Sequence, residues 1–269
     1  MEERMGINCS NLVLLAEYAR RHPLGSMLTY GRLFNTLSPS DRRRIVNSRE
    51  ISGSVLEEHN TENLFTHLGA KRVLSLDISN ADGADMLVDL MDDFASGGIM
   101  QQYLGNFDTV LDYGTSEHVF NFLQALVNAY NLLRPNGVYI FDLPVSGWVS
   151  HAVYQFSPSY FMALGNSPWF ELEWLFFHYK RGDSIFDIRH YHNISYSRIN
   201  GRKRVSAWGV IRKTVPAGRS TPLALSELRT IQVDPRQSNR TQGLRLISKL
   251  AGVRKYSARN VHRMFDRRD

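Results

Sequence analysis

The order of hydrophobic and polar positions is most regular between residues 107 and 143, where it predicts a strand, a helix and a second strand. The apolar run 109–111 begins the first strand, and a polar crossing that contains Gly114 follows it. Apolar residues then recur every three or four positions over 119–133, which is the period of a helix. Residues 138–141 are all apolar, which is typical of a strand covered on both faces. These elements and their short links predict a βαβ unit in a parallel sheet.

Similar patterns predict further elements on both sides of this unit. Before it we expect a strand at 26–31, a helix opening at Ser38-Pro39, a loop at 47–60, a helix at 61–69 closed by Gly69, and strands at 72–77 and 87–90. The helices that connect the strands at 72–77, 87–90 and 109–111 should be short at best. After it we expect a helix at 157–164, β-rich runs at 174–179 and 207–215, and between them a hairpin at 185–196 followed by an Asn200-Gly201 turn.

This order predicts an α/β fold with a doubly wound, Rossmann-like and mostly parallel sheet that carries an antiparallel edge strand. One domain would span residues 1–215, with an N-terminal helix, a core at about 25–144, and a lid with closing strands at 145–215. Residues 216–269 would form a basic C-terminal extension that the core does not need for folding.

The net charge of +6 is concentrated beyond Arg198, whereas residues 71–120 are acidic on balance. A basic tail can contact an anionic surface or a partner protein, although a solvated basic face is the simpler interpretation. Residues 241–250 could form a basic amphipathic helix that docks on the body, on a membrane or on a partner. No nucleic-acid motif accompanies the charge, so nucleic acid is not the expected partner.

The chain has one cysteine, Cys9, and no apolar run near the 18 residues that a membrane-spanning helix needs. The only apolar piece near the N-terminus, 12–15, is too short for a secretion signal. We therefore expect a cytoplasmic protein.

Small ligands bind at the carboxyl ends of the strands in such sheets. This places residues 112–118 and 142–144 at the predicted site. Asp77 ends a strand there, and a carboxylate can accept hydrogen bonds from both hydroxyls of a nucleotide ribose. The alternative role for Asp77 is a turn aspartate before Ser79-Asn80.

Four segments carry a family resemblance: VLSLDIS (73–79), LVDL (87–90), FDTVLDYGTSEHV (107–119) and LLRPNGVYIFDLP (132–144). Over roughly residues 25–215 the chain resembles class I, Rossmann-like S-adenosylmethionine-dependent methyltransferases. The resemblance implies that Asp77 holds the ribose, that Asp89 and Leu90 flank the adenine, and that 112–115 line the methionine end. The implied cofactor-binding set is Tyr30, Gly31, Asp77, Ile78, Asp89, Leu90, Asp112, Tyr113 and Gly114.

One departure from the family concerns the loop after its first strand, which is normally glycine-rich so that the backbone can approach the cofactor. Here residues 28–34 contain only Gly31. We expect an active methyltransferase despite this departure. The alternative that the missing glycines leave open is a degenerate, non-catalytic relative that works as a binding or scaffold subunit.

Histidines supply the candidate catalytic groups, because a neutral imidazole can take the proton that an acceptor hydroxyl loses on methylation. His118, His151 and Tyr154 are the predicted catalytic residues. The segment 154–158, YQFSP, is similar to one in methyltransferases of bacterial polysaccharide and secondary-metabolite gene clusters, which implies O-methylation of a small-molecule or saccharide acceptor. No metal is expected: His190 and His192 alone make no convincing site, and an ion held by Glu117, His118 and another carboxylate is the alternative.

Overall fold

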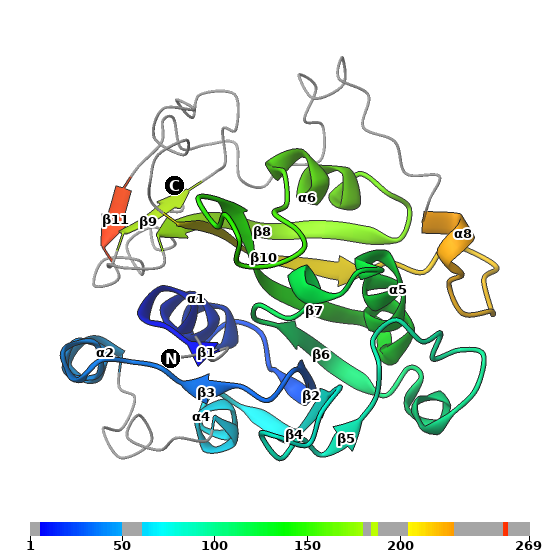
Figure 1. The fold of residues 1–269 in the computed structure, drawn as a ribbon, viewed down its shortest axis with the longest axis horizontal. Coiled ribbons are helices and arrows are strands. Elements are labelled where there is room, and N and C mark those ends of the chain that lie inside the picture. Colours follow the sequence, from blue (N-terminus) through cyan, green and yellow to red (C-terminus); the bar gives the residue numbers. More distant parts are fainter. Residues whose placement is uncertain (1–5, 50–60, 180–183, 188–203, 229–254, 258–269) are drawn as a thin grey trace.

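We describe the fold from a computed structural model, which places residues 6–49, 61–179, 184–187, 204–228 and 255–257. Within these described residues, a nine-stranded sheet forms the centre of the fold (Figure 1). From one edge to the other, the strands are β11 (Lys255–Ser257), β9 (Ser184–Asp187), β8 (Phe170–Tyr179), β10 (Val205–Lys213), β7 (Leu133–Ser146), β6 (Phe107–Asp112), β2 (Gly25–Tyr30), β4 (Ala70–Asp77) and β5 (Met86–Leu87).

The five strands from β5 to β7 are parallel, and β10, β8, β9 and β11 each pair antiparallel with their neighbours. Numbered by their order along the chain, the parallel strands lie across the sheet in the order 3-2-1-4-5, from β5 to β7. This is the doubly wound order. Successive strands are added toward one edge as far as β5 and then toward the other edge from β6, so the switch point lies between β2 and β6. The predicted Rossmann-like sheet with an antiparallel edge is confirmed.

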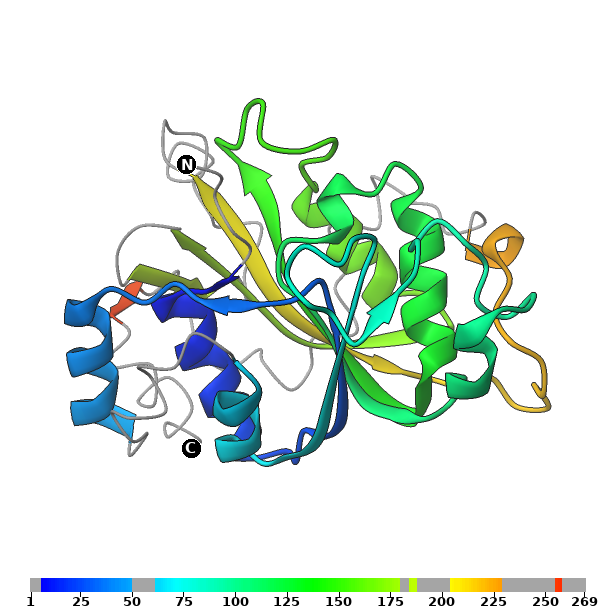
Figure 2. The ribbon, with the colours of Figure 1, turned by 60° about the horizontal axis from the view of Figure 1, so that its bottom comes forward.

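Helices cover both faces of the sheet (Figure 2). One face carries α1 (Cys9–Ala19), α2 (Pro39–Arg49) and α4 (Glu62–His67), together with the short parallel pair β1 (Gly6–Ile7) and β3 (Phe34–Asn35). The opposite face carries α5 (Phe122–Leu132) and α6 (Pro158–Gly165). Short elements complete the described chain: η1 (Ile99–Tyr103), η2 (Ser116–His118) and α8 (Leu225–Leu228).

The alternation of side chains along β7 separates two hydrophobic cores. Val138 and Ile140 pack into the core under α1, whereas Tyr139 and Phe141 pack into the core under α5 and α6. Successive side chains of a strand point to opposite faces, so a fully apolar strand is buried by helices on both sides. The apolar run at 138–141 was predicted to be such a strand.

Several predicted helices and turns agree closely with the structure. Ser38 accepts a hydrogen bond from the backbone N–H of Asp41 at the start of α2, as an N-cap does. Ser157 caps α6 in the same way. Gly69 closes α4 with a positive φ of 94°.

Two details differ from the sequence predictions, and one, the shortness of the helices between β4 and β6, agrees with them. The strand expected at 87–90 is only Met86–Leu87, and Asp89 lies in the turn after it. The link from β4 to β5 contains no helix, and η1 is the only helical element between β5 and β6. The closing pair β8 and β10 is not the sheet edge, because β9 and β11 extend the sheet beyond β8.

The first part of the C-terminal extension packs on the body. Leu223 and Leu228 belong to the core under α5, and Asn131 of α5 bonds both the N–H and the carbonyl of Leu223. Arg219 pairs with Glu227 and lies over the ring of Trp169. The domain division at 215/216 stays a prediction, but residues 219–228 are part of the folded body.

The loop predicted at 47–60 is wrong at its start, because residues 47–49 form the end of α2. Other predictions concern residues outside the described ranges: the rest of that loop at 50–60, the hairpin beyond Asp187, the Asn200-Gly201 turn, His190, His192 and the helix at 241–250. Among the described helices, none combines the length and apolar character needed to cross a bilayer.

Candidate functional site

Asp112 anchors the link between β6 and α5 at the carboxyl edge of the sheet. One of its carboxylate oxygens accepts the N–H groups of Thr115 (3.0 Å) and Ser116 (3.3 Å), and the other accepts the Tyr139 hydroxyl at 2.5 Å. Burial raises the pKa of Asp112, although these hydrogen bonds act in the opposite direction. Asp112 therefore shapes the loop, and the predicted contact with the cofactor falls to the backbone around it.

Three other predicted cofactor-binding residues direct their side chains into the core. Tyr30 donates its hydroxyl to the carbonyl of Ala125 at 2.9 Å, and Tyr113 accepts the indole N–H of Trp208 at 2.7 Å. Leu90 lies in the core under α5. Only the backbone of these residues can line a ligand at this edge.

Gly31 and Gly114 follow the two strands on either side of the switch point. Both have positive φ values, 75° and 91°, which disfavour side chains. A Cβ at Gly114 would lie 3.2 Å from a carboxylate oxygen of Glu117. The Gly31 N–H donates to the carbonyl of Leu76 at 2.8 Å, so the turn after β2 is tied to the end of β4.

Asp77 ends β4 beside exposed apolar side chains. One of its oxygens accepts the N–H of Ser79 at 3.1 Å, so the turn role foreseen for Asp77 is present. A carboxylate has about four acceptor sites, so this bond does not exclude a ribose. Ile78 is 72% exposed, and Leu87, which is paired with Asp77 across the sheet, is 53% exposed. Exposed apolar side chains next to a carboxylate suit the flat face of a nucleobase and its sugar.

Asp89 lies in the turn beyond β5, where it accepts the N–H of Met91 at 2.8 Å. It is half-buried, and Met91 beside it is 44% exposed. Asp89 therefore lies beyond the carboxyl end of β5, at the same edge of the sheet as the end of β4.

Arg32 occupies the place where a glycine-rich loop was expected. Its guanidinium donates to the hydroxyl of Ser75 (3.3 Å) and the carbonyl of Gly83 (3.2 Å), and pairs with Glu62 at 2.7 Å. Its backbone N–H lies 3.4 Å from the second carboxylate oxygen of Asp77. Arg32 thus fixes the links after β2 and β4 to each other with a large side chain.

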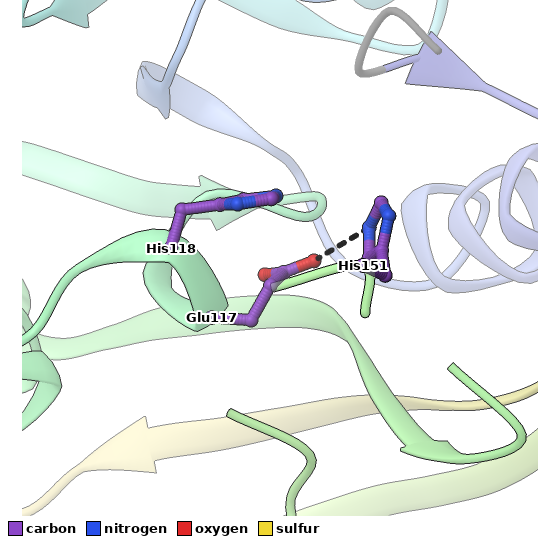
Figure 3. Close-up of side chains that lie close together, drawn as sticks. All are labelled: Glu117, His118 and His151. Carbon is purple, nitrogen blue, oxygen red and sulfur yellow. Dashed lines mark ion pairs between the residues drawn. The ribbon is translucent and has the colours of Figure 1, made fainter. Parts of the chain in front are cut away.

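Glu117, His118 and His151 converge at the same edge (Figure 3). One possible ligand atom from each residue lies within 4.8 Å of the other two, and Glu117 Oε1 is 4.0 Å from His151 Nε2. The imidazole rings of His118 and His151 meet edge to face, with centroids 5.2 Å apart. Glu117 and His118 come from η2, whereas His151 comes from the segment after β7. The side chain of Glu117 is 3% exposed and that of His151 is 20% exposed.

The electrostatics of this cluster favour neutral imidazole at His118. Although His118 is exposed, desolvation of its ring by its neighbours lowers its pKa, and the charge of Asp112 opposes this only in part. A neutral imidazole can accept a proton or bind a metal ion.

Tyr154 holds the segment that carries His151. Its backbone N–H donates to the carbonyl of Glu117 at 3.1 Å, and its hydroxyl donates to the carbonyl of Phe120 at 2.6 Å. Residues 151–154 are not helical, so Tyr154 does not lie one helical turn from His151. The contacts make Tyr154 a positioning residue for the cluster, while its predicted catalytic role remains a proposal.

Sequence reasoning missed two sets of contacts near this edge, although it placed residues 142–144 at the predicted site. Trp148 packs beside His151, with ring centroids 4.6 Å apart, and its indole N–H donates to the carbonyl of Val205. Asp142 turns toward α1, where it accepts from Asn11 (3.0 Å) and pairs with buried His178 (2.7 Å). No spacing along the chain links residues 142 and 178, so only the sheet pairing reveals them.

Comparisons with known proteins give similarities of fold. No family model matches the chain, and no curated protein does. Among solved structures, it is similar to a 1,6-didemethyltoxoflavin-N1-methyltransferase of Burkholderia thailandensis, with 16% identity, 77% of this chain and 78% of that chain covered, and a TM-score of 0.42. It is also similar to the N-methyltransferase NodS of Bradyrhizobium japonicum, with 11% identity, 77% and 94% covered, and a TM-score of 0.41. The Rossmann-like assignment itself rests on the strand order above.

Proposed function

We propose that this protein is an S-adenosylmethionine-dependent methyltransferase that acts on a hydroxyl of a small-molecule or saccharide acceptor. The observation that carries the proposal is the pairing of two chemistries along one sheet edge. Asp77 lies with exposed Ile78 and Leu87 on one side of the switch point, and the Glu117, His118 and His151 cluster lies on the other. S-adenosylmethionine likewise has a nucleoside at one end and the reactive sulfonium toward the other.

The transfer would be an in-line displacement in which the acceptor oxygen bonds the methyl carbon as the carbon–sulfur bond breaks. The protein's part is to align the two reactants and to remove the hydroxyl proton. We propose that His118 accepts this proton in the ion-free protein, because it is the exposed imidazole of the cluster. His151 and Glu117 would orient it.

Calorimetric titration with S-adenosylhomocysteine tests the cofactor site. Asp77→Ala should weaken binding by about ten- to a hundredfold, because two ribose hydroxyls lose a charged acceptor worth roughly 1.5–3 kcal/mol. Asp82→Ala, an exposed acid in the same link, is the matched control and should bind like the wild type. Equal affinities for all three proteins would remove Asp77 from the site.

A second candidate function, a non-catalytic binding or scaffold subunit of the same fold, is favoured by Arg32. If its side chain fills space that the cofactor needs, Arg32→Ala should tighten S-adenosylhomocysteine binding in the same titration. Weaker or unchanged binding would count against this alternative, since Arg32 would then leave the cofactor space open.

A further inference from the structure

The Glu117, His118 and His151 cluster has the composition of a metal site with three protein ligands. Two imidazoles and one carboxylate are a ligand set that binds Zn²⁺ and other first-row divalent ions and leaves a position open for substrate. The sequence predicted no metal and left an ion held by Glu117, His118 and another carboxylate as the alternative, whereas the structure brings His151 to the third place.

From this geometry we infer that the cluster binds one divalent transition-metal ion through Glu117, His118 and His151. Ligand atoms around an ion at about 2.0–2.2 Å are roughly 3.0–3.5 Å apart. The 4.0 Å between Glu117 Oε1 and His151 Nε2, and the 4.8 Å limit for the whole set, therefore need side-chain movements of about an ångström or less. The inference rests on these three side chains and not on the proposed function.

The backbone around the cluster holds the ligands near these positions. Tyr154 bonds the carbonyl of Glu117, and Trp148 is held by its bond to Val205. Phe156 donates its N–H to the carbonyl of Pro144 at 2.7 Å, which fixes the other end of the segment. The ligand-bearing loops are thus joined before any ion arrives, and a preformed site binds a metal at less cost.

Burial and access also suit a cation. Glu117 is almost fully buried, and a buried carboxylate is stable as an anion only when positive charge or hydrogen-bond donors compensate it. A divalent ion would add such compensation. His118 is exposed and His151 partly so, which leaves a path from solvent to the ion.

An ion here would change how the acceptor is activated. His118 would be a ligand, and an acceptor hydroxyl in the open position would lose its proton to solvent because the bound ion lowers the hydroxyl pKa. Imidazole ligands disfavour Mg²⁺ and Ca²⁺, which prefer oxygen. The site should therefore select transition metals.

Titration of the full-length, chelator-treated protein with Co²⁺, followed by its visible absorption, tests the site. We expect one Co²⁺ per chain with the absorption bands of a nitrogen- and oxygen-ligated ion, unaffected by millimolar Mg²⁺. His151→Ala and Glu117→Gln should each weaken binding by at least about 10–100-fold, the loss that removal of mere supporting residues already causes. His67→Ala, an exposed histidine on α4, is the control and should bind as the wild type does.

The inference is overturned if the wild type takes up no stoichiometric Co²⁺, or if His151→Ala and Glu117→Gln bind it as tightly as His67→Ala does. His151→Gln, which keeps a polar side chain of similar reach, replaces His151→Ala if that variant does not fold by circular dichroism. S-adenosylhomocysteine binding by the same proteins separates the two proposals. Co²⁺ binding without cofactor binding would leave the ion site standing and remove the methyltransferase.

Discussion

At the scale of single residues, the site depends on buried polar groups. The sequence predicted where they lie along the fold but not which way their side chains point. The family resemblance implied that Asp112 lies near the methionine end of the cofactor. In the structure its lone pairs are used by Thr115, Ser116 and Tyr139. A strand end predicts where a carboxylate lies, but the direction of its side chain depends on neighbours from other strands.

Asp112 gives a prediction about pH. Burial raises its pKa in the folded state, so the folded protein holds the Asp112 proton more tightly than the unfolded chain does. Between the unfolded pKa, about 3.9, and the raised folded value, this residue's contribution to the free energy of unfolding falls as pH rises. Asp112→Asn keeps an oxygen for the two N–H groups and cannot titrate. In urea unfolding at pH 4 and pH 7, the stability of the wild type relative to Asp112→Asn should be lower at pH 7. A difference that grows with pH would contradict the assignment.

The proposed proton transfer depends on His118. In the ion-free protein, His118→Ala should lower turnover of a methyl acceptor by about 10²–10⁴-fold and leave S-adenosylhomocysteine affinity little changed, because the lost group acts on the proton and not on the cofactor. His67→Ala is again the control. A loss of roughly 1–2 kcal/mol in stability with unchanged turnover would show that His118 only packs against its neighbours.

At the scale of elements, patterns with a strict period were predicted well and connections were not. The βαβ unit at the centre was recoverable because a strand buried on both faces and an amphipathic helix each leave a regular pattern. β5 is two residues long, too short for such a pattern, so Asp89 was expected at a strand end and lies in a turn. Glu117 and His151 meet through two irregular links, and no periodicity predicts where irregular links meet.

The packing of β10 on β7 gives a prediction at this scale. Gly209 lies opposite Phe141, and a Cβ there would come within 2.3 Å of the Phe141 ring, which stacks on Phe161 of α6. Gly209→Ala should therefore lower the free energy of unfolding by about 1–3 kcal/mol through overpacking. Ser206→Ala in the same strand, which adds no atom, should cost less. Equal losses in chemical unfolding would show that the ring moves freely aside.

At the scale of the whole molecule, the charge pattern suggested a separable basic tail, and the structure places its first part in the core. Composition cannot reveal that Leu223 and Leu228 pack under α5, because a balance of charge over the tail says nothing about where single leucines lie. A chain ending at residue 215 should unfold at a clearly lower temperature than a chain ending at Leu228, since each buried leucine contributes about 1.5–3 kcal/mol. Equal midpoints in thermal unfolding would show that residues 216–228 add nothing to the body.

We propose that the edge beside Asp77 binds S-adenosylmethionine rather than another nucleotide, although doubly wound sheets as a class accept several nucleotides. Calorimetric titration of the wild-type protein with S-adenosylhomocysteine, NAD⁺ and ATP in parallel tests this most directly. We expect one S-adenosylhomocysteine bound per chain, displaced by S-adenosylmethionine, and no saturable binding of NAD⁺ or ATP. Binding of NAD⁺ or ATP in place of S-adenosylhomocysteine, or of none of the three, would contradict it.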